Sequence, residues 1–301
     1  MLPNSVRIIE VGPRDGLQNE LADFDTSTRI ELINRLRNSG ITHIEAGAFV
    51  SPKWVPKMAD TNLVLQALDL DGPINYAVLV PNMRGLDLAI ESNVKEIAVF
   101  SAATESFSNR NINCGIQASL DRFRPVCERA LQHNIRVRGY ISCVLGCPYE
   151  GEVKLQTVDY VANELFGMGC YEVSLGDTIG TGTPLAAARL IEQLARSHAI
   201  DKLAVHFHDT YGQALANIYA ALQQGISAVD CSVAGLGGCP YAPGAAGNVA
   251  TEDVVYMLNG MGVAHNVDLE KLIDTAAFIL NKLNKNPVSR VSAAMLAKRN
   301  Q

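Results

Sequence analysis

Long apolar runs, basic clusters and an N-terminal targeting segment are all missing from this sequence of 301 residues. No stretch is apolar over enough residues to cross a bilayer, and neither a secretory signal nor a basic amphipathic presequence precedes the first expected strand. Lysine and arginine do not gather with aromatic residues, which argues against a nucleic-acid partner. These absences predict a cytoplasmic protein that binds neither membranes nor nucleic acids.

Cysteine patterns and nucleotide-binding glycines are also absent. The seven cysteines are an odd number, are scattered along the chain, and include no Cys-x-x-Cys pair. Reduced thiols in a cytoplasmic protein are the simplest account of that distribution. The Gly-x-Gly-x-x-Gly fingerprint of dinucleotide-binding folds does not follow the first expected strand, which weakens the case for a doubly wound open sheet.

Short β-rich runs alternate with amphipathic helical stretches along the chain. The expected strands are residues 6–11, 43–46, 75–80, 96–101, 136–142, 171–175, 203–207 and 228–233. The expected helices between them include residues 27–38, 85–92, 116–133, 155–168, 184–195 and 213–224. Eight consecutive βα units predict an α/β protein with a parallel sheet closed into a (β/α)8 TIM barrel.

The whole chain is expected to form one catalytic domain, residues 1–301. A length of 301 residues, 48% hydrophobic and 19% charged, suits a single barrel with an extension. Helices expected at 269–283 and 288–298 follow the last barrel unit, so about 265–301 is predicted to be an appended C-terminal segment.

Polar side chains recur where the expected strands end. They are Arg14, Asp15, Glu45, Asp177, His206 and His208. Barrel enzymes build their active sites from these ends and the loops that follow. Each side chain also has a plain structural alternative: Arg14 and Asp15 could form a salt bridge, Glu45 and Asp177 could cap helices, and Asn248 could cap the last barrel helix. Polar side chains at the ends of several different strands are improbable without a common function, so this pattern favours one shared site.

His206 and His208 point the same way because side chains alternate along a strand. Together with Asp15 they offer two nitrogens and one oxygen, and Asn248 could add an amide oxygen. Hard oxygen donors favour Mg²⁺ or Mn²⁺, while the two imidazoles leave Co²⁺ or Zn²⁺ open. Such a metal could chelate a substrate's hydroxyl and carbonyl oxygens, and Arg14 could stabilise an enolate oxyanion after carbon–carbon cleavage.

The segment 236–248 is rich in glycine and proline, which predicts a mobile or sharply turned loop. Cys239 stands in it between Gly238 and Pro240. It could be an acid or base delivered by loop closure, or an incidental loop thiol.

Four motifs together resemble the 3-hydroxy-3-methylglutaryl-CoA lyase family. They are VGPRDGLQNE at 11–20, GDTIG at 176–180, HFHDT at 206–210 and VAGLGGCPYA at 233–242. The resemblance covers nearly the whole chain. It implies metal-assisted cleavage of 3-hydroxy-3-methylglutaryl-CoA to acetyl-CoA and acetoacetate, a step of leucine degradation and ketone-body metabolism.

The resemblance also implies roles for particular residues. The implied metal ligands, for Mg²⁺ or Mn²⁺, are Asp15, His206, His208 and Asn248. The implied catalytic set is Arg14, Asp15, Glu45, Asp177, His206 and Cys239. In it Arg14 stabilises the thioester enolate, Glu45 orients the surroundings of the metal, Asp177 supports acid–base chemistry and Cys239 takes part in proton transfer.

Related metal-dependent barrels fit less well. Isopropylmalate-type synthases usually carry Gly-Glu-Arg-x-Gly-Asn where this chain has Gly-Gly-Cys-Pro, and biotin-dependent carboxyl transferases place a lysine where it has Gly176. A lyase for a longer 3-hydroxy-3-alkylglutaryl-CoA or for citramalyl-CoA stays open, as does a catalytically silent barrel kept as a binding protein. We expect an acyl-CoA thioester substrate, a bacterial cytoplasmic form, and assembly as a homodimer or higher homo-oligomer.

Overall fold

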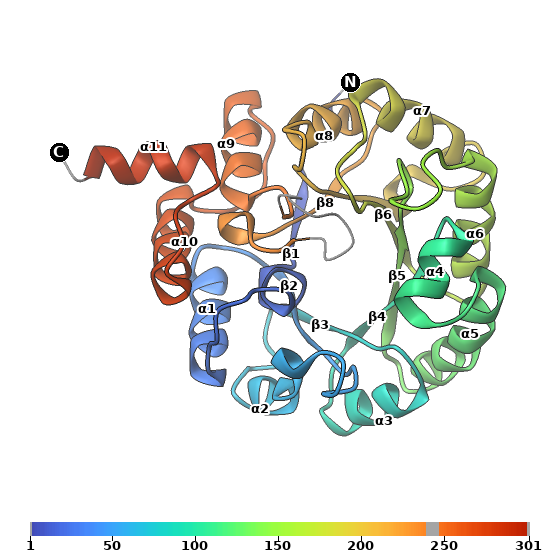
Figure 1. Ribbon diagram of the computed structural model, residues 1–301. Helices are drawn as coiled ribbons and strands as arrows, with labels where there is room; N and C mark the ends of the chain where they lie inside the picture. Colours follow the sequence, from blue (N-terminus) through green and yellow to red (C-terminus); the bar gives the residue numbers. More distant parts are fainter. Residues whose placement is uncertain (1, 239–246, 300–301) are drawn as a thin grey trace.

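Eight strands close into a barrel in the computed structural model, which describes residues 2–238 and 247–299 (Figure 1). Neighbouring strands are parallel throughout, and β1 pairs with both β2 and β8. The prediction of a (β/α)8 barrel is therefore confirmed. The strands are β1 (Arg7–Glu10), β2 (His43–Ala48), β3 (Asn75–Leu79), β4 (Glu96–Ala102), β5 (Arg136–Ser142), β6 (Glu172–Asp177), β7 (Leu203–Phe207) and β8 (Ala228–Cys231).

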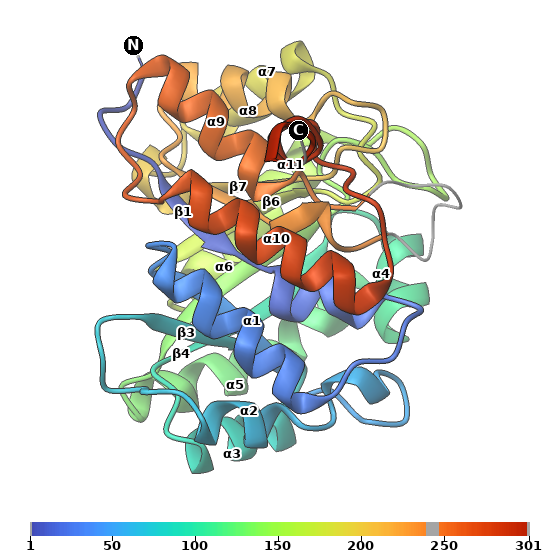
Figure 2. The same cartoon turned by 90° about the vertical axis from the view of Figure 1, so that its left-hand side faces the viewer.

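Helices surround the barrel on its outside (Figure 1). They are α1 (Thr26–Asn38), α2 (Thr61–Gln66), α3 (Met83–Glu91), α4 (Glu105–Ile112), α5 (Ile116–Gln132), α6 (Leu155–Gly167), α7 (Pro184–Leu194), α8 (Ala214–Gln223) and α9 (Thr251–Met261). Two further helices, α10 (Leu269–Leu283) and α11 (Arg290–Arg299), follow the barrel, and α10 packs beside α1 (Figure 2). Across the part of the chain that the structure describes, no helix has both the length and the apolar character needed to cross a membrane.

Two helices and three strand ends differ from the expectation. β2 and β6 each end two residues later than expected, at Ala48 and Asp177. Neither α2 nor α4 is expected from the sequence, because segments of six and eight residues are too short to show a clear helical period. The strand expected to reach residue 233 ends at Cys231, because Val233–Gly235 forms a 3-10 turn in which Ala234 has φ +60°.

The strands present an apolar face to the helices and a polar face to the barrel interior. Val137, Val173 and Val229 are fully buried, whereas Arg138 on β5 and Asp230 on β8 are hydrogen-bonded to each other inside the barrel. Because side chains alternate along a strand, the inward face of β7 carries His206. The interior below the rim therefore holds charged groups beside a small apolar cluster of Ile9, Val11, Ala204 and Ala228.

Candidate active site

The first strand delivers Arg14 and Asp15 through an unusually tight turn. Gly12–Gly16 forms one π-helical turn directly after β1. The buried carboxylate of Glu10 accepts hydrogen bonds from the backbone N–H of Gly12 at 2.8 Å and of Val233 at 2.9 Å. A Cβ at Gly12 would lie 2.5 Å from Glu10 Oε1, so a larger residue there would displace the carboxylate from these hydrogen bonds. Glu10 thus ties the loops after β1 and β8 together.

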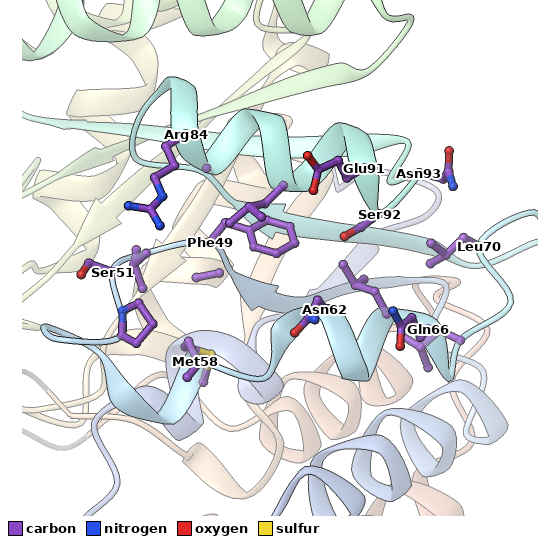
Figure 3. A pocket seen from close by; sticks show the side chains of 18 of the residues that line it. Phe49, Ser51, Met58, Asn62, Gln66, Leu70, Arg84, Glu91, Ser92 and Asn93 are labelled. Carbon is purple, nitrogen blue, oxygen red and sulfur yellow. The ribbon is translucent and has the colours of Figure 1, made fainter.

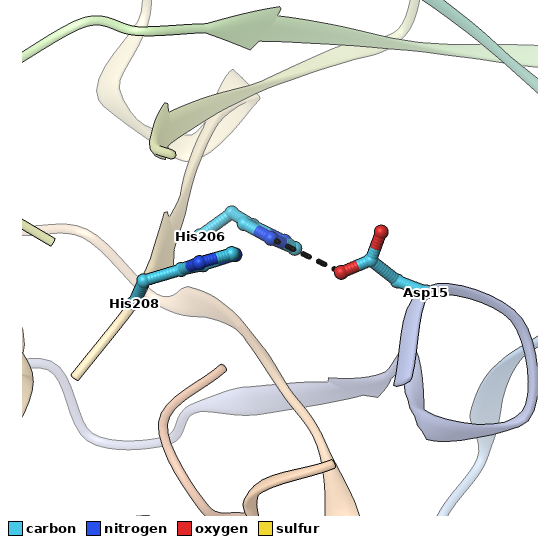
Figure 4. A group of neighbouring side chains, drawn as sticks. All are labelled: Asp15, His206 and His208. Carbon is cyan, nitrogen blue, oxygen red and sulfur yellow. Dashed lines mark ion pairs between the residues drawn. The ribbon is translucent and has the colours of Figure 1, made fainter. Parts of the chain in front are cut away.

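Three of the predicted metal ligands converge at the rim. Asp15, His206 and His208 each offer an atom, and these atoms all lie within 4.8 Å of one another (Figure 4). Within this trio, His206 Nε2 and Asp15 Oδ2 form an ion pair at 3.9 Å. The predicted cluster of two imidazoles and a carboxylate is therefore present in the geometry.

Asn248 joins this cluster through the backbone and through its side chain. The chain returns from the loop after β8 and pairs with the end of β7, so Asn248 lies opposite His208. Its Nδ2 donates to Asp15 Oδ2 at 2.9 Å and to the carbonyl of Leu236 at 3.2 Å. The alternative role as a helix cap is wrong, because α9 begins at Thr251 and its N-cap is Ala250.

The protonation states of His208 and Asp15 suit a divalent cation, whereas, against the effect of burial, Asp230 and Asp15 raise the pKa of His206. Burial lowers the pKa of His208 to about 4, so its imidazole is neutral at pH 7. Burial alone would raise the pKa of Asp15, but the Arg14 guanidinium, His206 and His208 lower it to about 2. His208 Nδ1 is buried and has no hydrogen-bond partner within the described residues. Neutral imidazole, carboxylate and amide together form a donor set that fits a divalent metal.

Arg14 bridges the metal cluster and the second strand. Its Nη1 donates to Asp15 Oδ1 and its Nε to Glu45 Oε2, both at 2.6 Å. Although burial disfavours its charge, the carboxylates of Glu45 and Asp15 raise the pKa of Arg14. The Arg14–Asp15 salt bridge, which the sequence left open as a structural alternative, is therefore present, and Glu45 contacts Arg14 instead of capping a helix. This places a fixed positive charge next to the proposed ligands.

Asp177 lies at the end of β6, next to the end of β7. It is fully buried, its Oδ2 accepts from the backbone N–H of Gly182 at 2.9 Å, and its Oδ1 has no partner among the described residues. Burial raises the pKa of its carboxyl to about 6. Its backbone carbonyl accepts from the N–H of His208 at 3.4 Å, which brings it to the edge of the cluster.

Cys239 lies outside the described residues, but both described ends of its loop adjoin the site. The loop enters through Gly237, whose φ of +119° and close approach to Asn248 Nδ2 leave no room for a side chain. Asn19 Nδ2 donates to the carbonyl of Gly238 at 3.3 Å, which links the loops after β1 and β8.

Sequence reasoning missed Asp230 on β8 and Arg138 on β5. Asp230 Oδ2 lies 3.4 Å from His206 Nδ1, and Arg138 binds both oxygens of Asp230. A signal was available, since charged residues inside otherwise apolar expected strands must face the barrel interior.

A cavity of about 1300 Å³ lies away from this cluster, between α2 and α3 (Figure 3). Phe49, Leu65, Asn62 and Arg84 are among its lining residues, and none of the predicted catalytic or metal residues is.

Comparison with known proteins agrees with this geometry. The chain matches the family model described as HMGL-like over residues 5–279. It is 57% identical over 297 residues to the 3-hydroxy-3-isohexenylglutaryl-CoA/hydroxy-methylglutaryl-CoA lyase of Pseudomonas aeruginosa, covering 99% of each protein.

Solved structures give the same result. The crystal structure of hydroxymethylglutaryl-CoA lyase from Pseudomonas aeruginosa matches with a TM-score of 0.96 and 57% identity over 99% of both chains. An HMG-CoA lyase from Acinetobacter baumannii, in complex with coenzyme A and 3-methylmalate, has a TM-score of 0.92 and 33% identity over 97% of this chain and 95% of that one. The chain therefore belongs to the HMGL-like family of carbon–carbon lyases.

Proposed function

We propose that this protein cleaves 3-hydroxy-3-methylglutaryl-CoA to acetyl-CoA and acetoacetate with the help of Mg²⁺ or Mn²⁺. One observation carries the proposal: Asp15, His206 and His208 converge beside a buried arginine in a chain that is 57% identical, end to end, to a hydroxymethylglutaryl-CoA lyase. The hard oxygen donors of Asp15 and Asn248 support Mg²⁺ or Mn²⁺ over softer metals.

The reaction is a retro-Claisen cleavage. A base takes the proton from the C3 hydroxyl, the C2–C3 bond breaks, and its electron pair moves onto C2 and the thioester carbonyl. C3 becomes the ketone carbon of acetoacetate. The enolate of acetyl-CoA then takes up one proton at C2, so the proton removed from the hydroxyl is balanced by the proton added to carbon.

Each proposed residue has a task set by its surroundings. Asp15, His206, His208 and Asn248 would hold the metal, which when bound supplies Lewis acidity toward the substrate's oxygens. Arg14 offers a charge, fixed by Glu45, to the enolate oxygen. Asp177, with its pKa raised to about 6 by burial and one carboxyl oxygen unpartnered in the described part of the chain, is suited to receive or return a proton.

A substrate panel tests the proposal. Thioesters that carry methyl, hydrogen or isohexenyl at C3, together with citramalyl-CoA, would be incubated with the metal-loaded enzyme and their products identified. We expect the methyl compound to give the highest kcat/KM, with acetoacetate and acetyl-CoA as products. A higher kcat/KM for the isohexenyl compound or citramalyl-CoA would show that this compound, and not the methyl thioester, is the preferred substrate. If none of the four compounds is cleaved, the proposed activity is refuted.

Cys239 is proposed to donate or accept a proton from the loop after β8. Alkylation should inactivate the enzyme, a substrate analogue should protect it, and Cys239→Ser should lose most turnover because a hydroxyl is a much poorer proton donor than a thiol. Cys114→Ser is the matched control and should keep full activity, since Cys114 lies in the loop before α5.

Mapping the alkylated peptide shows whether inactivation comes from Cys239 or from Cys143 or Cys147. Cys143 and Cys147 are buried, so reagent should reach them slowly. Inactivation that follows labelling of either one, with Cys239 unmodified, would contradict the assignment.

The place of the reaction in leucine degradation, a cytoplasmic location and assembly as a homodimer or higher homo-oligomer complete the proposal. Cell fractionation and light scattering of the purified protein would test the last two.

A further inference from the structure

A buried cluster of charged side chains fills the barrel beneath His206. The side chains of Arg138, Glu172 and Asp230 come from β5, β6 and β8 and are at most 2% exposed. Burying such groups is costly unless they are paired and hydrogen-bonded. Its position directly below a proposed metal ligand indicates that the cluster serves that ligand.

Asp230 is held in one orientation by three hydrogen bonds. Its Oδ1 accepts from Arg138 Nη2 at 2.8 Å, and its Oδ2 accepts from Arg138 Nη1 at 3.0 Å and from Ser174 Oγ at 2.7 Å. The paired guanidinium fixes the plane of the carboxylate. Oδ2 also lies 3.4 Å from His206 Nδ1, so the held carboxylate faces the imidazole.

The two nitrogens of His206 face different carboxylates. Nε2 is 3.9 Å from Asp15 Oδ2, on the side of the proposed metal, and Nδ1 is 3.4 Å from Asp230 Oδ2. An imidazole that offers the lone pair of Nε2 to a cation must carry its proton on Nδ1, and a carboxylate beside Nδ1 stabilises that arrangement. Neither Nδ1 makes a hydrogen bond within the described residues, but that of His206 has the Asp230 carboxylate within ion-pair distance. Among those residues no carboxylate forms an ion pair with His208, whose backbone is paired with Asn248.

We propose that Asp230 is a positioning residue that holds the ring proton of His206 on Nδ1 and aims Nε2 at the metal, with Arg138 and Ser174 keeping the carboxylate in place. The proposal rests on the proposed function for the presence of the metal. It deepens that function because it adds a residue that touches neither metal nor substrate.

The charges of the cluster balance in pairs, which makes a matched experiment possible. Arg138 is paired with Asp230 and also donates from Nε to Glu172 Oε1 at 2.7 Å, while Arg7 contacts Glu172 from below. Replacing Asp230 alone would leave the buried Arg138 without its main partner and could prevent folding. Two double variants avoid this, because each removes one positive and one negative charge.

The test variant is Asp230→Asn with Arg138→Gln, and the control is Arg7→Gln with Glu172→Gln. The control removes an ion pair from the same cluster but leaves the Arg138–Asp230 pair and its contact with His206. Binding of Mn²⁺ to the metal-free proteins would be followed by EPR of the free ion. We expect the test variant to bind about 10–100-fold more weakly than wild type, and the control to stay within about threefold. Equal affinities in the two variants would overturn the proposal.

A measurement on the wild-type protein tests the proposal even if the variants do not fold. ¹⁵N NMR of the histidine rings in the Mg²⁺-loaded enzyme should show the proton of His206 on Nδ1, and a proton on Nε2 would overturn the proposal. Neither readout needs the thioester. If Mn²⁺ binds as expected and no thioester is cleaved, the proposed function fails and the role of Asp230 stands. If wild type cleaves the thioester and the two double variants bind Mn²⁺ equally, only the role of Asp230 fails.

Discussion

Removing the divalent cation with a chelator is expected to abolish cleavage of the thioester, and Mg²⁺ or Mn²⁺ is expected to restore it. Asp15, His206 and His208 are gathered within 4.8 Å, and an ionised carboxylate beside a neutral imidazole is the state in which such groups bind metals. Arg14 is already paired with Asp15 and Glu45, so it does not replace the charge of the cation. Turnover would be measured before and after adding back each metal.

Binding and turnover can be separated with histidine variants. His208→Ala should lose Mn²⁺ binding as well as activity, because it removes one proposed ligand. His133→Ala is the matched control and should change neither, since His133 is exposed at the end of α5. Full activity in rigorously metal-free protein would contradict the proposed chemistry.

Arg14→Met is expected to lower kcat by about 10²–10³-fold or more, because it removes the charge offered to the enolate oxygen. Binding of Mn²⁺ should be largely retained, because Arg14 is not a proposed ligand. A kcat within about threefold of wild type would show that Arg14 has no such role. Stopped assays on the metal-saturated variant, with Mn²⁺ binding measured separately, provide the comparison.

The structure adds a control for this experiment. Arg14 is also the partner of Glu45, whose side chain is only 1% exposed. Removing one member of a buried ion pair costs about 3–5 kcal/mol of stability, because the other charge is left without compensation. Arg14→Met combined with Glu45→Gln removes both charges and should recover much of the lost thermal stability. If the double variant recovers stability without recovering kcat, instability of the Arg14→Met protein does not account for its lost turnover.

The sequence by itself determined the barrel and the rim on which the site lies. Eight βα units leave few arrangements other than a closed parallel sheet, and in that sheet every strand's carboxyl end meets at one face. That rule was enough to bring together Asp15 and Asn248, which are 233 residues apart in the chain and 2.9 Å apart in space. It also put His206 and His208 on one side of β7, because alternation along a strand is a local property.

Only the tertiary structure decided which side chains meet across the barrel. Arg14 could have paired with Asp15 alone, and the structure adds Glu45 from the neighbouring strand. Alternation indicates that Arg138 and Asp230 face inward, but not that they bond to each other behind His206. The physical reason is that local periodicity sets the direction of a side chain, whereas its partner depends on strand register, barrel closure and the lengths of side chains from distant segments.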